Sequence, residues 1–171
     1  DDWSDVFAFI DTLNYPDIPD ADFIEEVSRA INLDKWMRYL AADVLVGNRE
    51  GGLGTGRGDD YALYRGVEDP RFWLLPHDLD AVLGQGLPGY QPASDIFGYA
   101  RIPGLNRLLN HPDSLKLYYE HCRDLAETLF QPGNIFPFVE RMLGRWVAKS
   151  EIEGPQGIKE FVPDRLNNVL Y

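Results

Sequence analysis

The sequence predicts an α+β fold that is mostly α, with a helical body and one small β-hairpin. Apolar residues recur at helical spacing in both the first and the last third of the chain. Between these regions lies a short segment rich in β-forming residues, with a glycine-rich loop on each side. With 171 residues, of which 44% are hydrophobic, the chain can build one compact core. Residues 1–171 are therefore expected to form a single domain.

Three helices are expected before residue 48, each with apolar residues at helical spacing. They span residues 4–14, 22–33 and 34–47. Ser4 and Asp34 are the expected N-caps of the first and third helices, and Gly47 is the expected stop of the third. The apolar face of the third helix is expected to contain Trp36, Leu40, Val44 and Leu45.

The β-hairpin is expected from the segments YALYRG (61–66) and RFWLLPHD (71–78), joined by a turn at Asp69-Pro70. Pro76 should end the second strand because proline has no backbone N–H and a fixed φ. In an antiparallel pair, the start of one strand lies beside the end of the other. We therefore expect Asp60 and Asp78 to be neighbours, although they are far apart in the sequence.

The second half is expected to begin with a long irregular segment, residues 84–104, and then to become helical. A helix starting at Pro112 should bury one face, which contains Leu115, Tyr118, Tyr119, Cys122, Leu125 and Leu129. The helical pattern continues through residues 135–150, with Phe138, Met142 and Trp146. A last helix has Pro163 at its start or at a kink.

Composition excludes several classes of function. The net charge of −12 makes nucleic acid an unfavourable partner. A single cysteine and three histidines without zinc-motif spacing predict no disulfide and no cysteine-based zinc site. No segment is long and apolar enough to span a membrane. The chain starts without an initiator Met and is expected to be a piece of a longer protein, and the sequence does not indicate an oligomeric state.

One group of residues has the chemistry of a cation site: Glu50, Asp59, Asp60, Asp78 and Asp80. Converging carboxylates repel one another unless a divalent cation lies between them, and oxygen ligands favour Mg²⁺, Mn²⁺ or Ca²⁺ over zinc. In the alternative interpretation, Asp59 and Asp60 are turn residues, Asp80 caps a helix, and only Asp78 has a role. Spacing alone does not decide between the two.

Two further features near these acids have weaker functional interpretations. The glycine-rich stretch 51–58 offers backbone amides to a phosphate but matches no nucleotide-binding pattern, so a flexible loop is the favoured interpretation. His77 is either a base or ligand, or a strand-end residue bonded to nearby backbone, and the second interpretation is favoured. A carboxylate-pair hydrolase acting on glycans is a third, weaker hypothesis for the acids.

The segments LAADVLVGNREGG, GDDYALYRG and RFWLLPHDLDAVLG together resemble the CotH kinase family of bacterial spore-coat-protein-H-like proteins. The resemblance covers nearly the whole chain, and its central pattern is Y-x-L-Y followed by P-x-D-x-D. It implies a protein-kinase-like C-lobe. The implied activity is transfer of phosphate from ATP to Ser or Thr of a protein substrate, with Mg²⁺ or Mn²⁺ and with Ca²⁺ as another option. It also implies a secreted, cell-envelope or spore-coat location.

Carried over by position, the resemblance assigns roles to five residues. Asp78 matches the metal-binding aspartate and, with Asn48, is expected to contact the nucleotide. Asp60 matches the second metal ligand and has a catalytic role, and Asp80 supports the metal shell. Glu50 stands where the family usually has the catalytic Asp.

Several departures from the family pattern bear on activity. The loop between Glu50 and Asp60 looks longer than usual, which makes Asp59 or Asp60 an alternative base, and His77 replaces the usual Trp beside the nucleotide pocket. A glutamate at position 50 is one methylene longer than aspartate, and a displacement of about an ångström costs roughly a hundredfold in rate. The family's β-rich nucleotide-clamping lobe would precede residue 1, so this chain alone is expected to be weakly active or inactive. A second hypothesis is therefore a catalytically degenerate module that uses the same acids for Ca²⁺-stabilised binding.

Overall fold

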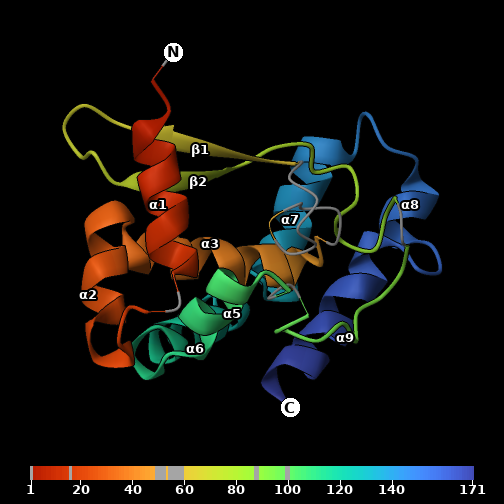
Figure 1. Ribbon diagram of the computed structural model, residues 1–171. Helices are drawn as coiled ribbons and strands as arrows, with labels where there is room; N and C mark the ends of the chain where they lie inside the picture. The colour runs from red at the N-terminus through yellow and green to blue at the C-terminus, as the bar shows by residue number, and fades with distance from the viewer. Residues whose placement is uncertain (1, 16, 49–52, 54–59, 87–88, 99–100) are drawn as a thin grey trace.

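The computed structural model describes residues 2–15, 17–48, 53, 60–86, 89–98 and 101–171. Two strands, β1 (Tyr61–Arg65) and β2 (Phe72–Pro76), form one antiparallel hairpin within these residues. The helices are α1 (Ser4–Asn14), α2 (Asp20–Ala30), α3 (Leu33–Val46), α5 (Pro103–Asn110), α6 (Pro112–Glu127), α7 (Pro132–Leu143), α8 (Lys149–Glu153) and α9 (Ile158–Leu170). The fold is thus α+β and mostly helical, as predicted (Figure 1).

Helix α3 lies at the centre of the molecule, between the hairpin and α6 (Figure 1). Its predicted apolar face is buried, and Met37 and Ala41 extend that face. Gly47 ends the helix with a left-handed φ of 69°, a conformation that glycine adopts without steric cost. The predicted N-cap was wrong: Asn32 caps the helix by accepting a 3.2 Å hydrogen bond from the Lys35 N–H. Asp34 lies inside the first turn, where its negative charge interacts favourably with the positive end of the helix dipole.

Helix α1 starts one residue earlier than its predicted N-cap implies, so Ser4 lies inside the helix. Trp3 occupies the N-cap position, and Ser4 is the first helical residue. The Ser4 N–H donates to the Asp2 carboxylate at 2.9 Å, so Asp2 provides the side-chain acceptor predicted for Ser4. Only one side of α1 is buried, through Phe9 and Leu13.

The hairpin packs against α3 through a buried aromatic cluster. The Trp36 indole N–H donates a 2.8 Å hydrogen bond to the Phe72 carbonyl. The Phe9 ring lies 5.5 Å from the Trp36 ring and 5.3 Å from the Phe72 ring, measured between centroids. At the closed end of the hairpin, the Asp69 carboxylate accepts hydrogen bonds from the Arg71 backbone and side chain. The Arg71 bonds lower the Asp69 pKa to about 2.

Replacing Trp36 by phenylalanine should lower the free energy of unfolding by about 1–3 kcal/mol. The substitution leaves the buried Phe72 carbonyl without this donor while keeping most of the apolar volume. Urea unfolding measures the effect, with Trp146→Phe as the matched control because Trp146 is exposed. Equal losses in the two variants would contradict a role for the hydrogen bond.

Helix α5 was not predicted, because its first turn contains Pro103 and Gly104 and the segment before it is rich in glycine and proline. Pro103 is compatible with the start of a helix, where its missing N–H has no partner to lose. A Cβ atom at Gly104 would lie 2.5 Å from the Leu13 carbonyl oxygen. Glycine is therefore required for the close approach of α5 to α1, rather than for a loop.

The predicted faces of the later helices were partly wrong. In α6, Tyr118 and Cys122 are buried as predicted, whereas Tyr119 is exposed. Leu129 is exposed as well, because α6 ends at Glu127. In α7 the buried residue is Val139. The apolar residues predicted for this region are exposed, namely Phe138, Met142 and Trp146.

One hydrophobic cluster joins elements from α1 to α9, from Phe9 to Leu166. Pro163, predicted at a helix start or kink, lies inside α9. Across the described part of the chain, no helix has the length and apolar character needed to cross a bilayer.

Candidate functional site

The open end of the hairpin holds two of the predicted acids. Tyr61, the first residue of β1, pairs with Pro76, the last residue of β2. Asp60 and Asp78 therefore lie just outside the paired strands, at the same end of the hairpin. Both have left-handed backbones, with φ of 58° and 48°, a conformation that aspartate adopts more readily than most other residues.

The acids differ in their exposure. Asp60 is half-buried, whereas Asp78 and Asp80 are exposed, as is His77. Asp80 lies in a turn and not at the start of a helix, so the alternative in which it caps a helix is wrong. A Cβ atom at Gly86 would lie 2.9 Å from the Asp80 carbonyl oxygen. The segment after β2 therefore folds back tightly on itself.

This segment is attached to the C-terminal end of α3 and to α9. The Leu83 N–H donates a 2.6 Å hydrogen bond to the Val46 carbonyl. A Cβ atom at Gly84 would lie 2.9 Å from the Phe161 ring, and one at Gly47 would lie 2.8 Å from the same ring. Phe161 of α9 thus packs against both glycines, and only residues without a side chain fit there.

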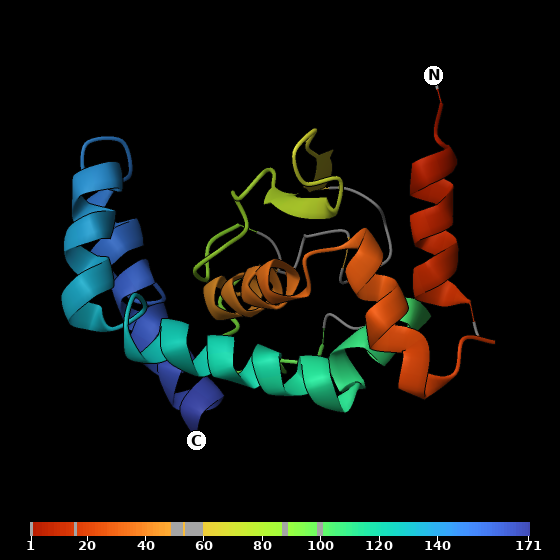
Figure 2. The ribbon, with the colours of Figure 1, turned by 90° about the vertical axis from the view of Figure 1, so that its left-hand side faces the viewer.

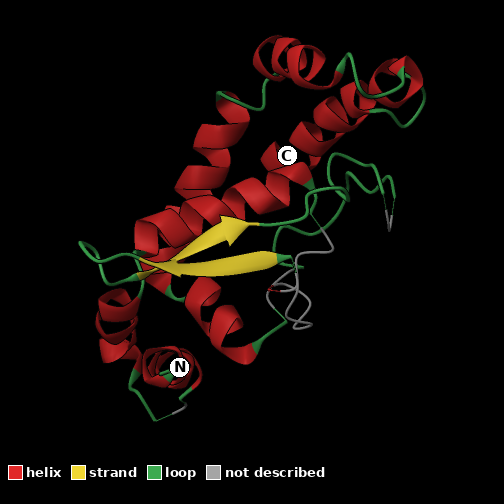
Figure 3. Cartoon of the chain, turned by 90° about the horizontal axis from the view of Figure 1, so that it is seen from above, coloured by secondary structure: helices red, strands yellow, loops and turns green. Residues whose placement is uncertain are grey.

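The chain from Phe72 to Leu83 runs along α3 in the same direction as the helix. Phe72 lies near the start of α3, where it forms a parallel bridge with Ile31. Leu83 lies near the end of α3, through its bond to Val46. The open end of the hairpin therefore faces the C-terminal end of α3, and the hairpin lies over this helix (Figure 3).

The C-terminal end of α3 contains a carboxyl–amide pair. Asn48 is completely buried, and its side-chain amide donates a 2.8 Å hydrogen bond to the Asp43 carboxylate. The Asn48 N–H also donates to the Asp43 carbonyl at 3.1 Å. Burial raises the Asp43 pKa to about 6, and the hydrogen bond from Asn48 opposes this effect.

Asp43 was missed from the sequence. The signal was an aspartate among the apolar residues of a helix, followed by Gly47 and Asn48. A carboxylate near a helix C-terminus is unfavourable for the helix dipole. Such a residue with a perturbed pKa is a candidate for a functional role.

Replacing Asp43 by asparagine should stabilise the protein above neutral pH. Between the ordinary aspartate pKa and about 6, the folded state keeps a proton that the unfolded state releases, so rising pH lowers this group's contribution to stability. An asparagine still accepts from Asn48 and has no charge to desolvate. We expect a gain of about 1–3 kcal/mol at about pH 7.5 and little gain at about pH 4.5.

Urea unfolding at the two pH values measures this gain. Asp17→Asn is the matched control, because Asp17 is an exposed residue between α1 and α2. A gain for Asp43→Asn that is the same at both pH values would contradict the burial of its charge.

Several predicted site residues lie outside the described residues. These are Glu50, Asp59 and the glycine-rich stretch 51–58 apart from Leu53. Within the described ranges, no three His, Cys, Asp or Glu side chains are grouped so that they could hold a metal ion. The assignment of Asp60, Asp78 and Asp80 as metal ligands stays a prediction.

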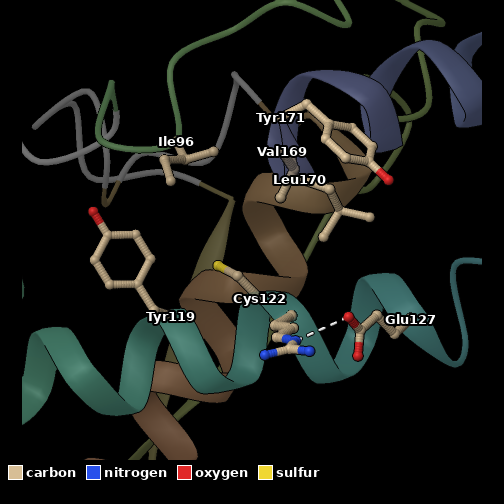
Figure 4. Close-up of a pocket in the computed structure, with 8 residues that line it drawn as sticks. Ile96, Tyr119, Cys122, Glu127, Val169, Leu170 and Tyr171 are labelled. Atoms are coloured by element: carbon tan, nitrogen blue, oxygen red, sulfur yellow. Dashed lines mark hydrogen bonds and ion pairs between the residues drawn. The ribbon is translucent and has the colours of Figure 1, made fainter.

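A separate hollow of about 450 Å³ lies between α6 and the end of α9 (Figure 4). Tyr119 and Cys122 line it from α6, and Arg123 is held beside it by a 2.9 Å ion pair with Glu127. Burial raises the pKa of the Cys122 thiol to about 11, which makes it an unreactive core residue at neutral pH. None of the predicted site residues lines this hollow.

Comparison with known proteins gives two matches. A protein of Bacillus subtilis (strain 168) described as inner spore coat protein H is 32% identical to this chain over 132 residues. The alignment covers 75% of this chain and 34% of that protein, so the chain spans about a third of the length of its relative. Residues 1–153 match the family described as CotH kinase protein. Because this match covers most of the chain, the protein belongs to the CotH kinase protein family.

Proposed function

We propose that this chain is the catalytic-lobe portion of a longer CotH-type kinase, which transfers phosphate from ATP to Ser or Thr of a protein substrate. Membership of the CotH kinase protein family supports the class of reaction. The observation that carries the proposal is the location of Asp60 and Asp78 at the same open end of the hairpin, next to the C-terminal end of α3.

The donor atoms at this end suit a nucleotide-bound magnesium or manganese ion. Carboxylate oxygens are hard ligands, and Mg²⁺ usually takes one or two of them together with phosphate oxygens and water. A cage built only from protein would require more ligands, and the described residues contain no group of three acids, cysteines or histidines that could hold a metal. Asp78 and Asp60 would hold the ion, with Asp80 in support.

The residues around the acids have distinct roles in this proposal. Asn48, to which the family resemblance assigns a nucleotide contact, is completely buried, so in this proposal it acts with Asp43 to fix the C-terminal end of α3 beside the acids. Glu50 orients the acceptor hydroxyl, and the charge of the ion bound to ATP offsets the negative charge of the phosphate oxygens. Phe161 and Gly84 hold the segment that carries Asp78 and Asp80 against α3.

The same relationship supports a location. The relative from Bacillus subtilis is described as an inner spore coat protein. We propose spore-coat association for the longer protein that contains this chain.

The full-length protein tests the proposed reaction, because this chain spans only about a third of the length of its relative. We expect transfer of labelled phosphate from ATP to protein Ser or Thr that requires Mg²⁺ or Mn²⁺. Calorimetric titration separates the alternative, a Ca²⁺-stabilised binding module. Nucleotide binding that depends on Mg²⁺ or Mn²⁺ supports the kinase, whereas Ca²⁺ binding without any response to nucleotide contradicts it.

A further inference from the structure

Helix α7 presents an apolar stripe that nothing in the described structure covers. Phe138 and Met142 are 52% and 53% exposed, and Trp146 in the turn after the helix is 85% exposed. A groove of about 560 Å³ runs beside this stripe, lined mainly by apolar side chains that include Leu129, Ile135 and Phe138. Contiguous exposed apolar surface of this kind is typical of an interaction site.

Positive charge lies along the same stripe. Arg141 and Arg145 are exposed, and their spacing from Phe138 places all three on one face of the helix and its following turn. The Arg141 guanidinium lies 5.5 Å from the centre of the Phe138 ring. Neither arginine forms an ion pair within the described residues. Glu140, the one acid of this helix, is instead paired with Lys159.

Helix α1 presents a second exposed apolar stripe. Trp3 and Phe7 are 60% and 64% exposed, and Ile10 is also exposed. These three residues follow helical spacing and lie on a different face from the buried Phe9 and Leu13.

One exposed acid lies beside the α1 stripe. Asp11 is exposed beside it, and its carboxylate has no ion pair among the described residues. The other acid of this helix, Asp5, lies on a different face and is paired with Arg65. The α1 stripe is therefore flanked by one acid without an ion pair, whereas the α7 stripe is flanked by two arginines without one, among the described residues.

The two stripes cannot meet within one molecule. Figure 2 shows α1 and α7 on opposite sides of the molecule, with the hairpin, α3 and α6 between them. The helices have 11 and 12 residues, which makes both about 16–18 Å long. They therefore match in length as well as in apolar character.

We propose that the α1 stripe of one molecule docks on the α7 stripe of a second copy of this chain. The aromatic residues of α1 fill the groove beside α7, and Asp11 lies against Arg141 and Arg145. The contact is heterologous, because it joins different surfaces of the two copies. Such a contact leaves one free α1 and one free α7 at the ends of every dimer, so it continues into longer chains unless it closes into a ring.

The affinity of one such contact is low. Two helices of this length bury less than the roughly 800 Å² per partner of a standard stable interface. Association should therefore rise with protein concentration and fall with salt, since the charges at the rim are screened.

A mixing experiment on this chain tests the head-to-tail geometry. Sedimentation velocity of the unmodified chain should show association that increases with concentration. Phe7→Glu disables the α1 stripe and Phe138→Glu disables the α7 stripe, and each variant alone should be monomeric. An equimolar mixture should form a dimer and nothing larger, because only one complementary pair of stripes remains. A Val67→Glu control, in the exposed turn of the hairpin, should associate like the unmodified chain.

Charge reversal gives a second, independent readout. Asp11→Arg and Arg141→Asp should each weaken association at least about tenfold, and the double variant should recover part of it. Arg101→Glu, a reversal at an exposed loop residue, is the matched control. A monomer at all concentrations would overturn the proposal. Self-association that survives in Phe7→Glu or in Phe138→Glu would overturn the head-to-tail arrangement. Circular dichroism of each variant verifies that the fold is retained.

Discussion

Replacing Arg165 by methionine is expected to lower the free energy of unfolding by about 3–5 kcal/mol. Arg165 of α9 is completely buried. Its guanidinium donates to the Val44 carbonyl at 3.1 and 2.9 Å and to the Pro92 carbonyl at 2.8 Å. It also donates to the Ser94 carbonyl and to the Asn168 side chain. Methionine fills a similar apolar volume but offers no donor to these carbonyls.

The position of the Val44 carbonyl explains why the effect is large. Val44 lies in the last turn of α3, where its carbonyl accepts a 3.0 Å hydrogen bond from the C-cap Gly47 N–H and belongs to the negative end of the helix dipole. One cation therefore holds the end of α3, the loop at residues 92–94 and α9 together. Its loss should loosen all three at once.

Urea unfolding measures this effect. Arg165→Lys should lose about half as much, because lysine keeps the charge but not the planar set of five donors. Arg123→Met is the matched control: Arg123 is an exposed arginine paired with Glu127 one turn away, and its replacement should cost less than about 0.5 kcal/mol. Similar losses for Arg165→Met and Arg123→Met would contradict the role of the buried bonds.

Replacing Asp78 by alanine should lower phosphotransfer by the full-length protein at least about a hundredfold. The proposal makes Asp78 a ligand of the metal ion that accompanies ATP, and its exposed carboxylate is available for this contact. Transfer of labelled phosphate from ATP to protein measures the rate.

The backbone of Asp78 requires a second variant, because its φ of 48° is unfavourable for alanine. Asparagine tolerates this conformation and removes only the charge, so Asp78→Asn should lose as much activity as Asp78→Ala. Asp69→Asn, in the turn at the closed end of the same hairpin, is the matched control and should leave the rate unchanged. An active Asp78→Asn variant would contradict a role in metal binding.

Most of the fold could be predicted because the relevant signals are local. The apolar spacing of α3, the stop at Gly47 and the strand end at Pro76 each depend on a few neighbouring residues. The errors arose where tertiary contacts decide. Gly104 looked like a loop residue but allows α5 to pack closely on α1, and the exposure of Phe138 could not be read from its apolar character.

At the candidate site, too, the features set by local sequence could be predicted and those set by tertiary contacts could not. The hairpin register that brings Asp60 and Asp78 to one end follows from the strand pattern. The burial of Asp43 and its bond to Asn48 do not, because they depend on how α3 is covered by segments distant in sequence. The roles of Asn48, Asp60, Asp78 and Asp80 in metal and nucleotide binding, and that of Glu50 in catalysis, stay predictions.

The contacts of α9 have a consequence for where this unit can be cut. The match to the family ends at residue 153, before α9 begins at Ile158. Yet Phe161 fills the space beside Gly47 and Gly84, and Arg165 holds the end of α3. An expression boundary drawn at the end of the family match would therefore remove the support beneath the acid-bearing segment. A fragment for biochemical experiments should therefore extend at least through Leu170, the last residue of α9.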